Sequence, residues 1–181
     1  MKHQMRSMIG KMKIKIPAYT VCIIGIILLQ STVLDYIRIY NVKPNLIIVF
    51  TVSVAFLNGS IEGAIVGFFA GLAQDIVTGK LIGFYALLGL YLGLAVGSIN
   101  KRLYRDNMLV VIFFTFISTI VYESAVYFLW SFRSIISGQI NLLYPLKEVI
   151  LPEVVYNSAI SVFVYILVMK LSRAFEETDR K

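Results

Sequence analysis

Residues 59–79 read GSIEGAIVGFFAGLAQDIVTG, and this stretch decides what kind of fold the chain can adopt. Its small residues recur at every fourth position: Gly59, Gly63, Gly67 and Gly71, followed at the same spacing by Asp75 and Gly79. Residues four apart share one face of an α-helix. In lipid, a face of small residues lets two helix backbones approach closely. The stretch therefore predicts an apolar helix that packs through its glycines inside a membrane.

The next apolar stretch repeats the pattern with Gly89, Gly93 and Gly97. Two interpretations remain open for these glycines: helix packing within one bundle, or docking of a separate protein. Asp75 continues the first glycine face, and a carboxylate at membrane depth is costly unless it is hydrated or paired. Asp75 is therefore a candidate for a structural or partner-binding role, although it lies near enough to the helix end to reach headgroup water or Lys80.

The composition of the whole chain agrees with a membrane setting. Of its 181 residues 59% are hydrophobic and 15% are charged, with a mean hydropathy of +0.82. Soluble domains carry about 25% charged residues. The charges here cluster at the two ends and in short patches between apolar runs. The net charge of +7 does not indicate nucleic-acid binding, because the basic residues lie where membrane topology places them.

Six segments approach the roughly 20 apolar residues that cross a bilayer as a helix. They are residues 17–37, 44–58, 61–78, 81–99, 108–132 and 149–171, between a basic tail (1–16) and a second tail (172–181). The second segment is short, bounded by Pro44 and by the turn-forming Asn58-Gly59-Ser60. Whether it crosses fully or is partly re-entrant stays open. The predicted fold is an all-α, six-helix integral membrane bundle.

The basic residues predict the orientation of this bundle. With six spans and the N-terminus in the cytoplasm, twelve of the 17 Lys and Arg residues lie on the cytoplasmic side. The other side keeps Arg38, Lys43, Lys80, Arg133 and Lys147. Cytoplasmic loops carry an excess of Lys and Arg, so both termini are expected in the cytoplasm. The basic tail before residue 17 is either an interfacial helix on anionic headgroups or a flexible segment.

Polar residues run along the last two segments at helical spacing. Thr115, Ser118, Thr119, Tyr122 and Glu123 form a stripe on the fifth, and Glu153, Asn157, Ser161 and Tyr165 form one on the sixth. Two inward-facing stripes could line a substrate cavity or could hydrogen-bond the two helices to each other. The second interpretation is favoured. Glu123, Asn157 and Ser161 are the candidate residues.

Catalytic templates are not matched. The single histidine, His3, lies in the basic tail, and the single cysteine, Cys22, lies in the first apolar segment. A membrane serine protease needs an intramembrane histidine, and the zinc-protease motif H-E-x-x-H is absent. We therefore expect no catalytic residue, no metal and no cofactor.

The order of several short motifs resembles the rod shape-determining protein MreD family. They are Leu29-Gln30; Lys43-Pro44-Asn45-Leu46; the glycine run from Gly63 to Asp75 with Gly79, Gly83 and Ala86-Leu87; and Pro152 with Tyr156-Asn157. The resemblance covers most of the chain and marks Gln30, Pro44 and Asn45 as motif positions. Glu123 matches no family motif, and the loop after Gly79 departs from the pattern by carrying Lys80.

The resemblance implies a non-enzymatic subunit of the bacterial cell-elongation machinery in the cytoplasmic membrane. Its implied partner is MreC and, through MreC, the MreB filament and the peptidoglycan-synthesising pair of a SEDS glycosyltransferase and a class B transpeptidase. The implied fold is similar to the S components of energy-coupling-factor transporters. That similarity supplies the alternative function, a vitamin-capture subunit. It is disfavoured because the first apolar segment offers only Gly25 where S components carry alanines at fours.

Overall fold

The computed structural model describes residues 2–38, 42–79, 81–99, 107–136 and 145–178. Its regular elements are helices: α1 (Lys2–Ser31), α2 (Val33–Tyr36), α3 (Leu46–Asn58), α4 (Ser60–Thr78), α5 (Phe84–Ile99), α6 (Met108–Ile136), the π-helical turn η2 (Leu146–Ile150) and α8 (Leu151–Thr178). The expected all-α class is confirmed. The connection before η2 and the loop between α5 and α6 fall outside the described residues.

Four stretches are long and apolar enough to cross a membrane: Lys15–Tyr36, Ser60–Thr78, Met108–Leu129 and Leu146–Phe175. The other two major helices, α3 and α5, are apolar but have only 13 and 16 residues. At 1.5 Å per residue they span about 20 and 24 Å, against a hydrocarbon core of about 30 Å. The six expected segments are thus six helices, of which four have full membrane-spanning length.

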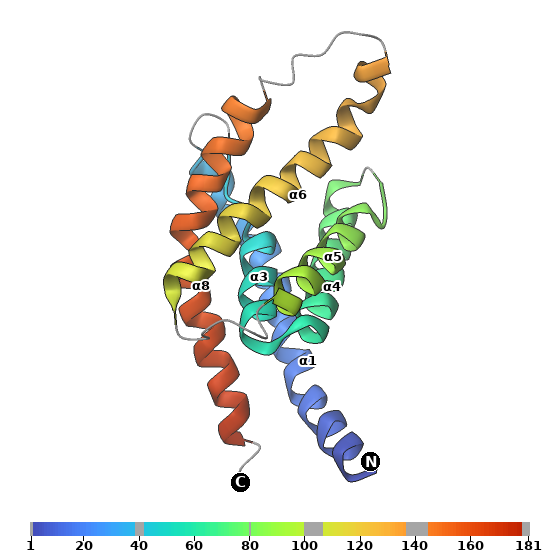
Figure 1. The fold of residues 1–181 in the computed structure, drawn as a ribbon, viewed down its shortest axis with the longest axis vertical. Helices are drawn as coiled ribbons and strands as arrows, with labels where there is room; N and C mark the ends of the chain where they lie inside the picture. The colour runs from blue at the N-terminus through green and yellow to red at the C-terminus, as the bar shows by residue number, and fades with distance from the viewer. Residues whose placement is uncertain (1, 39–41, 80, 100–106, 137–144, 179–181) are drawn as a thin grey trace.

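The short helix α3 is the centre of the molecule (Figure 1). Every residue from Leu46 to Phe56 is buried, and α4, α5, α6 and α8 all contact it. Three apolar clusters share its side chains, around Phe50, Val52 and Phe56 respectively. Because its sides are covered by other helices, α3 does not have to match the bilayer thickness as a lipid-facing helix would.

The first helix, α1, continues through Pro17 and has no break between the basic tail and the first apolar segment. It ends at Ser31, and after Thr32 the short α2 follows. The N-terminal end of α1 and the C-terminal end of α8 lie at the same end of the molecule (Figure 1). We refer to this as the tail end, and to the opposite one as the far end.

Candidate functional site

The glycine face of α4 packs against the glycines of α5. A Cβ atom added to Gly67 would overlap the carbonyl of Gly89, and one added to Gly93 would overlap the carbonyl of Gly63. A Cβ on Gly71 would meet the backbone of Tyr85 in the same way. Only glycine permits this approach. In this structure the face is occupied by a neighbouring helix of the same chain.

The two ends of the α4–α5 pair are also in contact. A Cβ on Gly97 would overlap the backbone of Ser60, where α4 begins. Gly63 faces two helices at once, since its own added Cβ would overlap Ala55 of α3. The interface therefore runs along the whole length of both helices, and α3 packs against it.

Asp75 ends the glycine face as a cap for α5. Its carboxylate accepts hydrogen bonds from the backbone N–H groups of Gly83 (2.9 Å), Tyr85 (3.0 Å) and Ala86 (3.1 Å). The first N–H groups of a helix have no partner within the helix, and a carboxylate there also interacts favourably with the helix dipole. Asp75 is only 1% exposed. A buried carboxylate requires hydrogen-bond partners, and these three N–H groups supply them.

The turn between α4 and α5 depends on two glycines. Gly79 closes α4 with φ +66° and donates its N–H to the Asp75 carbonyl at 2.9 Å, and Gly83 precedes α5 with φ +99°. Side-chain-bearing residues rarely adopt such angles. The turn brings the start of α5 back onto the Asp75 side chain.

The polar stripes of α6 and α8 meet inside the bundle. The Asn157 amide donates from Nδ2 to Thr119 Oγ1 at 3.1 Å. Glu123 of α6 and Glu153 of α8 lie near each other in the same interior. All four side chains are less than one-tenth exposed. The stripes therefore join α6 to α8 directly.

Asn45 connects this pair of helices to α3. Its backbone N–H donates to Asn157 Oδ1 at 2.8 Å, and its Nδ2 reaches Glu123 Oε1 at 3.4 Å. Asn45 immediately precedes α3, after the buried Pro44. The family motif had marked both residues, but no local pattern indicated that Asn45 completes the polar cluster.

Ser161 takes a different role from its neighbours on the stripe. It is fully buried, but its hydroxyl donates to the carbonyl of Ser158 in its own helix at 2.6 Å. It therefore does not reach α6 through this bond. Asn157 is the residue of α8 that connects to both α3 and α6.

A second polar network lies at the tail end, and the sequence analysis missed it. Glu62 of α4 pairs with Lys15 of α1 at 2.6 Å and accepts a hydrogen bond from Tyr19 at 3.2 Å. Asn58 donates to Tyr19 at 2.6 Å and accepts from Ser172 of α8 at 2.9 Å. This network joins four helices, and the separation of its members along the chain hid it from motif searches.

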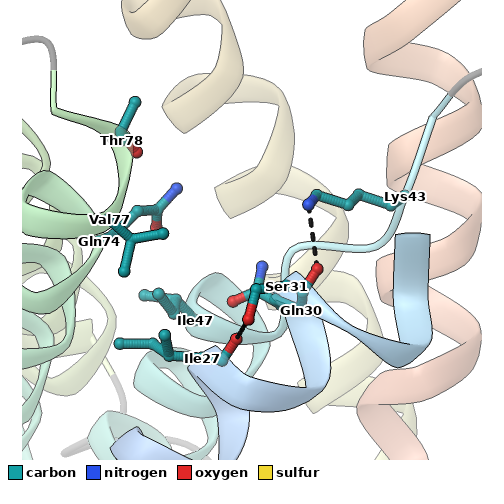
Figure 2. A pocket seen from close by; sticks show the side chains of 8 residues that line it. All are labelled: Ile27, Gln30, Ser31, Lys43, Ile47, Gln74, Val77 and Thr78. Carbon is teal, nitrogen blue, oxygen red and sulfur yellow. Dashed lines mark hydrogen bonds between the residues drawn. The ribbon is translucent and has the colours of Figure 1, made fainter.

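Gln30, the first motif position, borders a hollow at the far end (Figure 2). The hollow has a volume of about 150 Å³ and is lined by Ile27, Gln30, Ser31, Lys43, Ile47, Gln74, Val77 and Thr78. Lys43 donates to the backbone carbonyl of Gln30 at 3.0 Å and to Asp35 at 2.8 Å. These bonds tie the end of α1 to the segment that leads into α3.

Among the described residues, no group of three or more His, Cys, Asp or Glu side chains is placed to hold a metal ion. The polar contacts described above join helices and cap a helix end. A helical bundle with four membrane-length helices and internal polar ties defines a multi-pass α-helical membrane protein.

Comparison with known families makes the assignment specific. The family model for the rod shape-determining protein MreD matches residues 12–175, so the chain belongs to the MreD family and the resemblance in its motifs is confirmed. No curated protein and no solved structure matches the chain. The family is one of shape-determining membrane proteins.

Proposed function

We propose that this chain is a non-enzymatic scaffold subunit of the bacterial cell-elongation machinery, which binds MreC and thereby links the MreB filament to peptidoglycan synthesis. The observation that carries the proposal is the family match over residues 12–175. On this proposal the indirect partners are a SEDS glycosyltransferase and a class B transpeptidase. The chain contributes a membrane-embedded surface and performs no reaction.

The way the polar stripes are used supports a scaffold over a carrier. An S component of an energy-coupling-factor transporter would need its intramembrane polar groups to face a ligand. Here Asn157 of α8 bonds to Thr119 of α6 and accepts the backbone N–H of Asn45, just before α3. Such bonds stabilise helix association. The similarity of fold to S components, which suggests the vitamin-capture alternative, stays a prediction.

We further propose that α1, α3, α4, α5, α6 and α8 form six crossings of the bacterial cytoplasmic membrane, with both termini in the cytoplasm. The excess of Lys and Arg in the tails and in one loop supports this orientation. An even number of crossings agrees with the common position of the two helix ends (Figure 1). The tail end is then cytoplasmic and the far end external.

The test is affinity purification of the full chain from its native host in a mild detergent, followed by mass spectrometry. We expect a single-span MreC protein to copurify and depletion of the chain to round rod-shaped cells. Recovery of transporter ATPase subunits with a bound vitamin would contradict the proposal and support the alternative. Recovery of neither, with unchanged cell shape, would also contradict it.

A further inference from the structure

We propose that the hollow at the far end binds the head group of a glycerophospholipid that carries both a phosphate and a hydrogen-bond donor, as phosphatidylglycerol and phosphatidylethanolamine do. The hollow lies between the last turns of α1 and α4 and the chain that leads into α3 (Figure 2). This site does not depend on the proposed scaffold function. Four features of the hollow lead to it.

The first feature is depth. Gln74, Val77 and Thr78 belong to the last turns of α4, whose membrane-capable stretch ends at Thr78. Gln30 and Ser31 lie one to two turns before the end of the corresponding stretch of α1 at Tyr36. The ends of membrane-spanning helices lie near the boundary between hydrocarbon and head groups. Lipid head groups therefore surround the mouth of the hollow.

The second feature is charge. Lys43 lines the hollow and bonds to Asp35, which also pairs with Arg38 at 2.7 Å. One carboxylate between two basic side chains leaves a net positive charge beside the hollow. Among the residues that line it, none is acidic. A phosphodiester is an anion, so it is complementary in charge to this side of the hollow.

The third feature is an unsatisfied acceptor. Gln74 Oε1 is buried and has no hydrogen-bond partner in the protein. A buried polar atom without a partner is unfavourable. Figure 2 shows the Gln74 side chain on the α4 side of the hollow, opposite Gln30. A glycerol hydroxyl or an ethanolamine ammonium group would satisfy this oxygen, whereas a choline group has no N–H or O–H to donate.

The fourth feature is an apolar wall. Ile27, Ile47 and Val77 line the same hollow as the polar residues. A cavity needs about 10–15 Å³ of such volume to hold one water molecule, so the 150 Å³ hollow accepts a group several times larger. A soluble phosphate would leave the apolar wall uncovered, and a lipid would place its glycerol and upper acyl carbons against it. This favours a membrane lipid over a free phosphate.

The experiment is native mass spectrometry of the full chain with equal amounts of phosphatidylglycerol, phosphatidylethanolamine and phosphatidylcholine. We expect the first two to be retained about tenfold more than phosphatidylcholine, as one unsatisfied hydrogen bond implies. Glycerol 3-phosphate should not displace them. Equal retention of all three lipids would overturn the proposal. Displacement of the lipids by glycerol 3-phosphate would show that the hollow binds a soluble phosphate and not a membrane lipid.

Variants of Gln74 locate the binding. Gln74→Glu places a negative charge in the hollow at constant size and should abolish retention of phosphatidylglycerol. Gln74→Leu removes the amide at similar size and should bring the retention of phosphatidylethanolamine down to that of phosphatidylcholine, since both lipids are zwitterionic. Lys170→Gln makes the same change in net charge as Gln74→Glu, at an exposed site on α8, and should leave the preference intact. Retention of phosphatidylglycerol by Gln74→Glu, or a preference for phosphatidylethanolamine over phosphatidylcholine in Gln74→Leu, with an unchanged melting temperature, would place lipid binding elsewhere and refute the site.

Discussion

At the scale of single residues, short polar side chains satisfy backbone groups that the membrane leaves without water. Asp75 bonds three N–H groups at the start of α5. Asn157 accepts the N–H of Asn45 just before α3. In hydrocarbon such a backbone group is unfavourable when it has no partner. These two side chains therefore fix where two short helices begin.

Loss of the Asp75 carboxylate should destabilise the protein by removing this cap. We expect Asp75→Ala to lower the free energy of unfolding by about 1–2 kcal/mol, the usual cost of a lost cap. Asp75→Asn retains one acceptor oxygen and should cost less. Thermal unfolding in detergent measures both. Equal melting temperatures for wild type and Asp75→Ala would show that the cap is not needed.

Loss of the Asn157 amide should be costly for a related reason. Asn157→Ala leaves the Asn45 N–H without its acceptor and Thr119 Oγ1 without its donor, so we expect a loss of about 1–3 kcal/mol. The matched control is Ser158→Ala on the same helix. Ser158 Oγ is buried and has no partner, so its removal should change stability by less than about 0.5 kcal/mol. The reverse order of the two melting temperatures would contradict the cluster.

At the scale of elements, α4 and α5 form the most closely packed pair of helices in the described structure. Their glycines lie backbone to backbone, so the pair has no side-chain layer between its axes. In lipid, such packing replaces the hydrophobic driving force that joins helices in water. The pair, together with α3, forms the part of the bundle least able to accept added volume.

Enlarging a glycine in this pair should separate the helices. Gly67→Leu would drive a branched side chain into the Gly89 carbonyl, and overpacking typically costs about 1–3 kcal/mol. Gly25→Leu is the control within the membrane, because a Cβ at Gly25 meets nothing within 4 Å. We expect a lower melting temperature for Gly67→Leu and no change for Gly25→Leu. Equal stability of the two variants would refute the close α4–α5 contact.

At the scale of the whole molecule, two features support the proposed orientation of the bundle. The N-terminal end of α1 and the C-terminal end of α8 lie together at the tail end (Figure 1), and the basic residues are unevenly distributed along the chain. The network of Lys15, Glu62, Tyr19, Asn58 and Ser172 joins α1, α3, α4 and α8 at the tail end. At the far end, Lys43 ties α1 to the chain before α3. The bundle is thus held by polar contacts at both of its ends.

The proposed orientation can be tested by cysteine labelling in a Cys22→Ser background. A cysteine at Asn141 should react with a membrane-impermeant reagent in intact spheroplasts. A cysteine at Arg105 should react only after the membrane is permeabilised, because the loop that contains it is basic and expected in the cytoplasm. If only Arg105→Cys reacted before permeabilisation, the orientation would be the reverse of the proposed one. If both cysteines reacted in intact spheroplasts, the two loops would lie on the same side, which contradicts the single crossing by α6 between them.

The sequence by itself determined the class of this protein, its family and the approximate position of each helix. Composition, apolar length and glycine spacing are local properties, and each can be read along one segment. The stripe of α6 and that of α8 could also be recognised in this way, and so could Asp75 as a buried carboxylate.

The tertiary structure decided which faces oppose one another. It paired the α4 glycines with those of α5, gave Asp75 the N-terminus of α5 as its partner, and added Asn45 to the cluster of Glu123 and Asn157. It also brought Glu62 to Lys15 and left the hollow beside Gln74. Periodicity shows which residues share a face. It does not show what that face meets, because lipid tails are as apolar as a protein interior and so remove the contrast that distinguishes inside from outside in water.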